Sequence, residues 1–425
     1  MKRDYKLTMF DVIMLVISLV IGMGIFRAPA TVALRAGDET LFYVAWILGG
    51  VFAIAGALTF AAAGRAMPVT GAYYRIFAVA YHPVIAFAIN MIILVSNAAS
   101  AAGVAIIGAE YITSWLPGIP TSTTATAMIA VLYGLNLLGL RTSTAVQNVL
   151  IGIKVAMLMA IISALIFVDA APASTALASI AHTGGVWESL GLALIAVSFT
   201  YGGYQSTINF GGEIKDSERR MPIAIVLGVL IITAIYLLAN AAYVHVLGFE
   251  TLAQSQSIAA MVVGKLFGER GADILSAVLI ISVFGYVNVA MLSNPRVIKA
   301  MSDDGVLPRA LSSSPRMQHG ALLSFTLLSI LSVYVGKSFE TILNYTIFID
   351  AIGLGFGAAT VYWLSKQRLS IVTHIAAAIF IGSCVFTSIN IFAFDTQAAY
   401  YGIALVAGIC LVGWIAYRMR EQPTS

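Results

Sequence analysis

Long runs of apolar residues, separated by short polar or Pro/Gly-containing breaks, extend along almost the whole chain. Each run is close to the roughly 20 residues that an α-helix needs to cross about 30 Å of hydrocarbon. Segments of about ten residues with strict apolar–polar alternation, the pattern of a membrane β-barrel, are absent. The pattern predicts an all-α integral membrane protein with twelve transmembrane helices, at residues 8–34, 41–64, 84–113, 123–140, 145–168, 188–212, 223–247, 271–300, 320–336, 339–363, 370–393 and 398–417.

The composition supports a membrane protein. Of the 425 residues, 60% are hydrophobic and 10% are charged, whereas a soluble domain has about 45–50% and about 25%. The predicted loops are too short for a soluble domain, so the chain is interpreted as one transmembrane domain over 1–425. No basic tract indicates a nucleic-acid partner. The two cysteines, Cys384 and Cys410, lie in apolar runs without metal-ligand spacing, and no metal or other cofactor is expected.

The positive charges orient the predicted helices. With the N-terminus inside the cell, seventeen of the 23 Lys and Arg residues fall on the cytoplasmic side: Lys2, Arg3, Lys6, Arg65, Arg75, Arg141, Lys215, Arg219, Arg220, Arg296, Lys299, Arg309, Arg316, Lys366, Arg368, Arg418 and Arg420. Five fall outside: Arg27, Arg35, Lys265, Arg270 and Lys337. Cytoplasmic loops of membrane proteins are enriched in Lys and Arg. We therefore expect both termini in the cytoplasm and the protein in the plasma (cell inner) membrane.

Two of the predicted helices carry glycines near their centres. The first contains "IGMGIF" (21–26), and the sixth, which opens the second half of the chain, contains "FTYGGYQ" (199–205). Glycine disfavours a helix interior, and interruptions at matching places in two halves indicate an inverted-repeat transporter. Close helix packing is the alternative explanation of such glycines. Freed amides would bind a carboxylate and freed carbonyls an ammonium group, which together suit an amino acid.

Four stretches resemble one transporter family: "IGMGIFRAP" (21–29), "AMPVTGAYY" (66–74), "FTYGGYQSTINFGGEIKDSERRMPIAI" (199–225) and "FGYVNVAMLSNPRVIKAMSDDGVLP" (284–308). The chain is similar to the amino acid–polyamine–organocation superfamily, closest to its L-type amino acid transporter branch. The resemblance implies the leucine-transporter fold. In that fold helices 1–5 (8–168) and 6–10 (188–363) are inverted 5+5 repeats with helices 1 and 6 broken, and the last two helices (370–417) are peripheral.

The resemblance also implies which residues bind the substrate. Main-chain amides of the first-helix motif, Gly22, Met23, Gly24 and Ile25 after Ile21, correspond to those that hold the substrate carboxylate. The aromatic residue that closes over the substrate corresponds to Phe199, and the carbonyls that hold its ammonium group belong to Phe199, Thr200 and Gly202, around Tyr201. Met23 stands where the family usually has a small residue, and Ala62 where it usually has an acid.

Lys154 is a single charge inside the fifth predicted helix, about 15 Å from its inner end. A charge at that depth is costly, so it is expected to face the bundle and to have partners. In the family that the chain resembles, a lysine at this position replaces sodium and contacts the first helix and a hydroxyl on helix eight, for which Ser282 is the candidate. Transport is therefore expected to need no sodium.

The sequence predicts a sodium-independent permease for neutral L-amino acids, working by alternating access through exchange or proton coupling. A polyamine or organic-cation transporter would need acids at its site, and Asp350 is the only candidate. Asp350 itself is interpreted as a packing or gating group rather than a substrate contact. A non-transporting amino acid sensor is a third reading, and no catalytic constellation indicates an enzyme.

Partners are expected to be the amino acid and the lipid bilayer. In the branch that the chain resembles, some members pair with a single-pass glycoprotein through a cysteine in the second outer loop. That loop, 114–124, has no cysteine here, so a disulfide-linked ancillary subunit is not expected. The protein is predicted to be a monomer or a homodimer. Arg27, just beyond the first interruption, is either a charge that attracts carboxylates or one that extends towards the water interface.

Overall fold

The computed structural model describes residues 6–68, 72–115, 118–137, 144–172, 185–255, 257–303, 307, 318–336, 338–364 and 369–421. Some positions used to predict the orientation lie outside these residues: Lys2, Arg3, Arg141, Arg309, Arg316, Lys337, Lys366 and Arg368. The same holds for part of the resembling stretches 66–74 and 284–308 and for two residues of the outer loop 114–124.

All regular elements of the described residues are helices. They are α1 (Met9–Val20), η1 (Gly24–Phe26), α2 (Ala28–Ala36), α3 (Glu39–Ala66), α4 (Ala72–Ala80), α5 (Pro83–Trp115), α6 (Thr121–Leu137), α7 (Thr144–Phe167), α8 (Val186–Tyr201), η2 (Tyr204–Asn209), η3 (Gly211–Glu213), α9 (Ser217–Leu247), α10 (Phe249–Gln254), α11 (Ile258–Phe267), α12 (Glu269–Asp303), α13 (Gln318–Gly336), α14 (Phe339–Ala359), α15 (Val361–Leu364), α16 (Ile371–Phe394) and α17 (Thr396–Glu421). One isolated parallel bridge joins Leu7 to Ile214.

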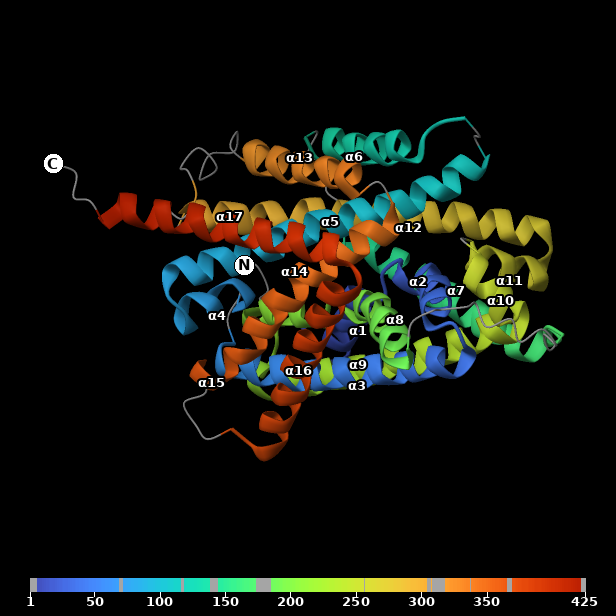
Figure 1. Cartoon of the computed structure of the whole chain (residues 1–425), viewed down its shortest axis with the longest axis horizontal. Coiled ribbons are helices and arrows are strands. Elements are labelled where there is room, and N and C mark those ends of the chain that lie inside the picture. The colour runs from blue at the N-terminus through green and yellow to red at the C-terminus, as the bar shows by residue number, and fades with distance from the viewer. Residues whose placement is uncertain are drawn as a thin grey trace.

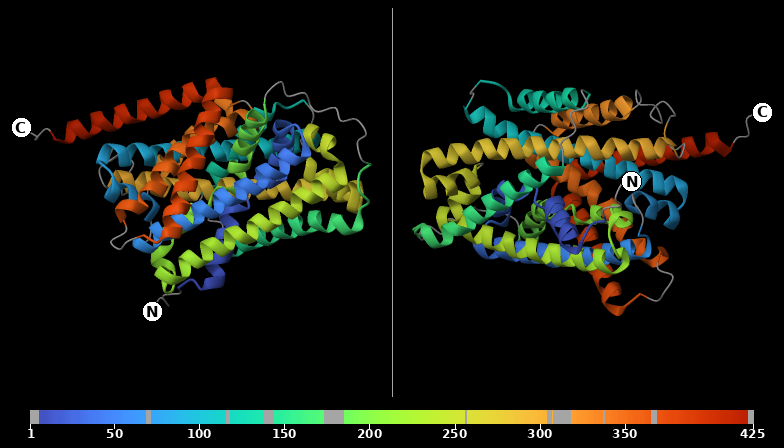
Figure 2. Two further views of the ribbon diagram at one scale, coloured as in Figure 1. Left: turned by 60° about the horizontal axis from the view of Figure 1, so that its bottom comes forward. Right: turned by 180° about the vertical axis from the view of Figure 1, so that it is seen from behind.

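The long helices form a bundle whose axes follow the long dimension of the molecule. Helices α3, α5, α9 and α12 run along this axis, and α14 and α16 cross them (Figure 1). The short helices α10 and α11 lie at one end of the bundle, whereas α4 and α15 lie at the other. Turned views in Figure 2 show α17 extending beyond the body of the protein towards the C-terminus. Helices α1, α2 and α8 are enclosed by the long helices, packed on α9 and α3.

Eight described helices are long and apolar enough to cross a membrane: 39–66, 83–113, 217–247, 269–299, 319–336, 339–364, 371–394 and 396–415. These helices confirm the all-helical membrane class, while the total of twelve spans and the two inverted repeats stay predictions. Two predicted spans coincide with several shorter elements. Residues 8–34 contain α1, η1 and most of α2, and residues 188–212 contain most of α8, then η2 and part of η3.

Small residues on α3 allow its neighbours to pack closely. A Cβ atom at Gly49 would lie 2.2 Å from a methyl carbon of Val197 on α8, and one at Gly56 would lie 1.9 Å from the hydroxyl oxygen of Tyr204 on η2. Both positions therefore require a residue without a side chain. Without a hydrophobic driving force between helices in lipid, such close packing is a main source of helix association. It fixes α3 against the elements on either side of the second interruption, α8 before it and η2 after it.

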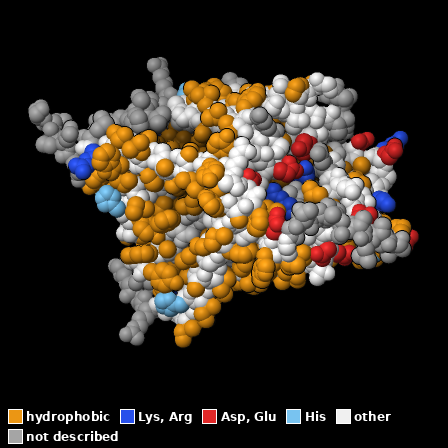
Figure 3. All heavy atoms as spheres, viewed as in Figure 1, with side chains coloured by type: hydrophobic (Ala, Val, Ile, Leu, Met, Phe, Trp, Pro, Cys, Tyr) orange, Lys and Arg blue, Asp and Glu red, His pale blue; other side chains and the backbone are white. Residues whose placement is uncertain are grey.

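The outer surface matches a lipid environment. Large apolar side chains are widely exposed along the long helices, for example Ile166 at 79%, Ile274 at 65% and Ile389 at 61%. Figure 3 shows apolar side chains over most of the visible face, with acidic and basic side chains gathered towards the end that carries α10 and α11. A water-soluble monomer would rarely expose so continuous an apolar surface.

Candidate functional site

Helix α1 begins with a capping box and ends in the apolar interior. Thr8 accepts a hydrogen bond from the amide of Asp11, whose carboxylate accepts from the amide of Thr8, which fixes the start of the helix. The helix ends at Val20, and Ile21 takes a non-helical conformation (φ −69°, ψ 83°). Helical geometry resumes only at η1, followed by α2 with Pro29 in its first turn. The chain thus leaves the helix where glycines flank Met23.

Main-chain groups are left without partners at this point. The amide of Gly22 donates to Val20 and that of Phe26 to the carbonyl of Met23. The N–H groups of Met23, Gly24 and Ile25 find no acceptor among the described residues. Met23 and Ile25 are nevertheless buried, with 1% and 0% exposure. Buried amides without acceptors cost free energy unless a ligand or water satisfies them.

The α-helix of the sixth predicted span, 188–212, also ends inside the span. Helix α8 ends at Tyr201; Gly202 is extended (φ −64°, ψ 158°), and Gly203 has a φ of +118°, which side chains rarely adopt. The amide of Gly203 turns away from the helix and donates to the side chain of Gln205 at 2.9 Å. Within the described residues, the carbonyl oxygens of Phe199, Tyr201 and Gly202 accept no hydrogen bond. These oxygens supply acceptors beside the free amides of the first segment.

The two irregular segments are in contact. A Cβ atom at Gly203 would lie 2.2 Å from the carbonyl oxygen of Leu19, and one at Gly24 would lie 3.1 Å from the hydroxyl oxygen of Thr200. The end of α1 therefore touches the second residue after α8, while η1 touches the last turn of α8. The free donors and the free acceptors consequently belong to two segments that are in contact in the interior.

Tyr236 on α9 binds both helix ends. Its hydroxyl lies 3.2 Å from the carbonyl oxygen of Val20 and 3.3 Å from that of Thr200, and the residue is fully buried. Its ring packs against Tyr201 and Trp46, with centroids 5.3 Å and 6.1 Å away. One hydroxyl shared between the two carbonyls satisfies part of the exposed main chain and holds the two ends in register.

On one side, aromatic and ionic contacts cover the irregular segments. The Phe199 ring packs edge-on against the Phe339 ring of α14, with centroids 5.6 Å apart. The Arg27 guanidinium carbon lies over the Phe339 ring, 5.8 Å from its centroid. Arg27 is paired with Glu340 at 2.6 Å and with Glu110 of α5 at 3.6 Å. With 5% exposure, Arg27 neither extends to the interface nor forms an open vestibule charge. It joins α2, α5 and α14.

Lys154 and Ser282 are both buried, with 8% and 0% exposure. Lys154 lies on α7 and Ser282 on α12, two helices that pack together. Among the described residues, the Ser282 hydroxyl has no hydrogen-bond partner, and Lys154 forms no hydrogen bond or ion pair. A buried ammonium group and a buried hydroxyl thus remain available for a ligand, water or rearranged main chain.

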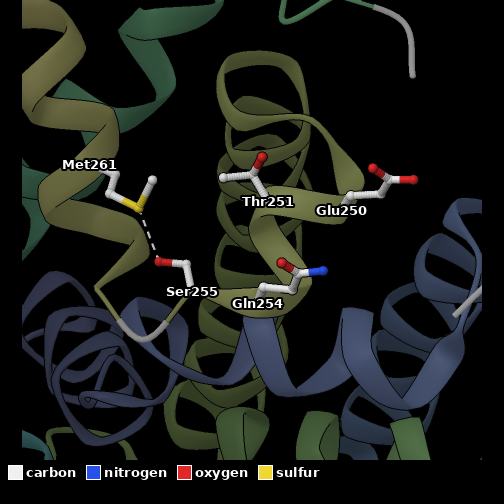
Figure 4. A pocket seen from close by; sticks show the side chains of 5 residues that line it. All are labelled: Glu250, Thr251, Gln254, Ser255 and Met261. Atoms are coloured by element: carbon white, nitrogen blue, oxygen red, sulfur yellow. Dashed lines mark hydrogen bonds between the residues drawn. The ribbon is translucent and has the colours of Figure 1, made fainter. Parts of the chain in front are cut away.

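A surface pocket lies elsewhere, on α10 and the start of α11 (Figure 4). It is lined by Glu250, Thr251, Gln254, Ser255 and Met261, and the Ser255 hydroxyl donates to the Met261 sulfur at 3.0 Å. None of the predicted site residues lines it. The pocket belongs to helices α10 and α11 rather than to the interrupted segments.

Comparison with known proteins decides the family. The profile described as "Amino acid permease" matches residues 7–417, nearly the whole chain. The chain belongs to the amino acid permease family. The permease is 31% identical to the serine/threonine exchanger SteT of Bacillus subtilis (strain 168), over 70% of this chain and 68% of that protein. It is 26% identical to the large neutral amino acids transporter small subunit 2 of Mus musculus, over 81% and 67%.

A third relative aligns over almost the whole permease. The cystine/glutamate transporter of Pongo abelii is 23% identical over 97% of this chain and 84% of its own length. These similarities confirm an amino acid–polyamine–organocation transporter close to the L-type branch. They also confirm that the permease is a transporter rather than an enzyme.

The sequence motifs identified the irregular segments but not what surrounds them. The structure brings together the predicted residues Ile21–Ile25 and Phe199–Gly202. Sequence reasoning missed Tyr236, which carries no motif, and did not pair Arg27 with Glu340, 313 positions away. A tyrosine within an apolar run is a weak signal, because most such residues simply pack in the core.

Proposed function

We propose that the permease binds an amino acid as a zwitterion between the two irregular segments and carries it across the membrane by alternating access. The α-carboxylate accepts from the amides of Met23, Gly24 and Ile25. The α-ammonium group donates to the carbonyls of Phe199 and Gly202. The free main-chain donors and acceptors in contact across Gly24 and Thr200 are the observation that carries this proposal.

The covering contacts suggest how access alternates. In this proposal Phe199, packed edge-on against Phe339, is the aromatic lid of the site, and Arg27 with its two carboxylates closes the outer side. Opening outward requires α2 to separate from α5 and α14, which breaks both ion pairs. The bridge between Leu7 and Ile214, with hydrogen bonds of 2.8 Å and 3.1 Å, joins the chain before α1 to the segment before α9. We assign this bridge to the inner closure.

The proposed transport is sodium-independent, with Lys154 and Ser282 occupying the place of a coupling ion. Neutral L-amino acids are the proposed substrates, moved by exchange or in company with protons. The names of two relatives, a serine/threonine exchanger and a large neutral amino acids transporter, support this substrate class. The buried ammonium group without a partner among the described residues supports the sodium independence.

The same proposal includes the membrane arrangement. Twelve spans form two inverted repeats with broken first and sixth helices, both termini are cytoplasmic, and the protein resides in the plasma membrane as a monomer or homodimer without a disulfide-linked subunit. The irregular segments after Val20 and Tyr201 support the broken helices. Cys384 is buried and Cys410 is exposed within α17, outside the second outer loop.

Purified permease in liposomes provides the test. Vesicles loaded with unlabelled leucine should take up radiolabelled L-leucine equally in sodium and choline buffers. Empty vesicles with and without a pH gradient distinguish exchange from proton coupling. Absence of uptake for every amino acid in a panel, despite folded protein in the membrane, would falsify transport. A strict sodium requirement would refute the role given to Lys154.

A further inference from the structure

Arg35 connects α2 to two other helices. It lies in the last turn of α2. Its guanidinium donates to the carbonyl oxygen of Leu192 in α8 at 3.1 Å and to the side-chain oxygen of Asn344 in α14 at 2.9 Å. Helix α2 also packs extensively on α8. The first hydrogen bond therefore stays within one packed pair of helices, whereas the second joins that pair to α14.

Asn344 extends this contact to the connection between α16 and α17. Its side-chain nitrogen donates to the Asp395 carboxylate at 2.6 Å, while its side-chain oxygen accepts from Arg35. Asn344 is buried, with 9% exposure. The acceptor end of the amide thus faces a cation and its donor end faces an anion, so both hydrogen bonds are charge-assisted. One buried amide connects two opposite charges.

The Asp395 carboxylate uses its two oxygens differently. Oδ1 accepts from the amide of Ala398 at 3.1 Å, which caps the start of α17. Oδ2 accepts from Asn344. A helix cap needs only one side-chain oxygen, so capping does not account for the contact with α14.

Helix α2 is attached to one face of α14 at two levels. Arg27, at the start of α2, pairs with Glu340, and Arg35, at its end, bonds to Asn344. Glu340 and Asn344 are four positions apart on α14 and therefore lie on the same face. Because α2 follows directly after the free amides of 23–25, its attachment to α14 controls how far the first irregular segment can open.

We propose that Arg35, Asn344 and Asp395 form an outer latch, which holds α2 and α8 against α14 and the α16–α17 connection until the outer side opens. This inference rests on the proposed function, in which that opening separates α2 from α14. Asn344 and Asp395 are positioning residues, because they act on α2 through Arg35. The two helices that the sequence predicts as peripheral thereby take part in opening the site.

Modification of a single cysteine measures this opening without any transport. Thr31→Cys places a thiol on α2, one turn before Arg35 on the same face, at a position with 4% exposure. The variant is made in the full-length permease with Cys384→Ala and Cys410→Ala, so that it carries one thiol. The initial rate of its reaction with a maleimide in detergent reports how often α2 leaves its closed position.

Asn344→Leu and Asp395→Ser should each raise this rate about fivefold, because the closed arrangement loses a charge-assisted hydrogen bond. Serine retains a good helix cap and lacks the second oxygen. The double variant should react no faster than the faster single variant, because both changes break the same chain of hydrogen bonds. Asp38→Ser is the matched control: Asp38 caps α3 three residues after Arg35, and its replacement should leave the rate unchanged.

Three results would overturn the latch. The first is an unchanged rate in both single variants at native melting temperatures. The second is a multiplication of the two effects in the double variant, which would show that they are independent. The third is an equal rise in Asp38→Ser, which would attribute the effect to loss of any nearby acid. If Asn344→Leu does not fold, Arg35→Gln combined with Asp395→Ser provides the same comparison.

The latch and the proposed function can fail separately. Faster modification of the latch variants, together with no uptake of any amino acid by the native protein in liposomes, would leave the latch standing and refute transport. Unchanged modification of the same variants, together with normal leucine uptake by the native protein, would refute the latch alone.

Discussion

Gly203 lies directly against the main chain of Leu19, so that a Cβ atom there would come within 2.2 Å of the carbonyl oxygen. The contact joins the second residue after α8 to the last turn of α1, and it occurs at a φ of +118°. Close approach and unusual backbone conformation coincide at one position. Glycine is thus required there for two independent reasons.

Gly203→Ala is accordingly expected to destabilise the permease by at least about 2 kcal/mol, through backbone strain and the clash with Leu19. Gly202→Ala is the control, because a Cβ atom there would meet nothing closer than 3.7 Å and the backbone is extended. Apparent melting temperatures in detergent measure both. Equal melting temperatures for the two variants would contradict the described contact.

Tyr236→Phe should separate the ends of α1 and α8. Loss of the shared hydroxyl leaves two buried carbonyls without their donor and costs about 1 kcal/mol. Uptake should fall about tenfold or more because the binding groups lose their alignment. Tyr243→Phe, on the same helix, removes a hydroxyl that has no hydrogen-bond partner in the described part of the chain and should retain activity. Matching losses in the two variants would argue against a specific role for Tyr236.

The two ion pairs of Arg27 should differ in strength. Glu340 lies 2.6 Å from the guanidinium and Glu110 lies 3.6 Å away. Double-mutant cycles with Arg27→Gln, Glu340→Gln and Glu110→Gln should give a coupling of about 1 kcal/mol or more for Glu340, which is partly solvated, and a smaller one for Glu110. Thermal unfolding of the native protein, the single variants and the double variant of each cycle provides the two coupling energies. A larger coupling with Glu110 would show that the ion pairs are arranged differently in the working protein.

Lys154→Gln should abolish uptake if the ammonium group occupies the place of a coupling ion. Lys265→Gln on α11 is the control and should leave uptake unchanged. Uptake by the native protein should be the same in sodium and choline buffers, because the Lys154 ammonium group supplies the positive charge that a sodium ion would otherwise bring. Initial rates in liposomes measure both effects. Full activity of Lys154→Gln in choline would leave the buried lysine without the proposed function.

The sequence was sufficient for the membrane class and the family, because both depend on features of local sequence. Apolar runs of membrane length predict helices without knowledge of their neighbours, and the family similarity over residues 7–417 confirms the motif-based assignment. Glycines at 22, 24, 202 and 203 also indicated where helical geometry is unfavourable. The number of spans and the repeat symmetry stay predictions, since eight described helices meet the membrane-spanning criteria.

Contacts between distant residues were beyond the sequence. Arg27 was interpreted as a vestibule or interface charge because its partners, Glu110 and Glu340, lie on two other helices. Tyr236 resembles any buried aromatic residue until α9 is placed beside the ends of α1 and α8. Helix α4, within a segment predicted as a loop, is short and rich in aromatic residues, and its helical period was not evident against the apolar background.

A structure of the permease with a bound amino acid tests the central claim most directly. The account predicts the substrate carboxylate at hydrogen-bond distance, about 2.7–3.2 Å, from amides of residues 23–25, with its ammonium group at the carbonyls of 199–202. Ligand density confined to another place, such as the surface pocket on α10 and α11, with the main-chain groups of both segments paired internally, would contradict it.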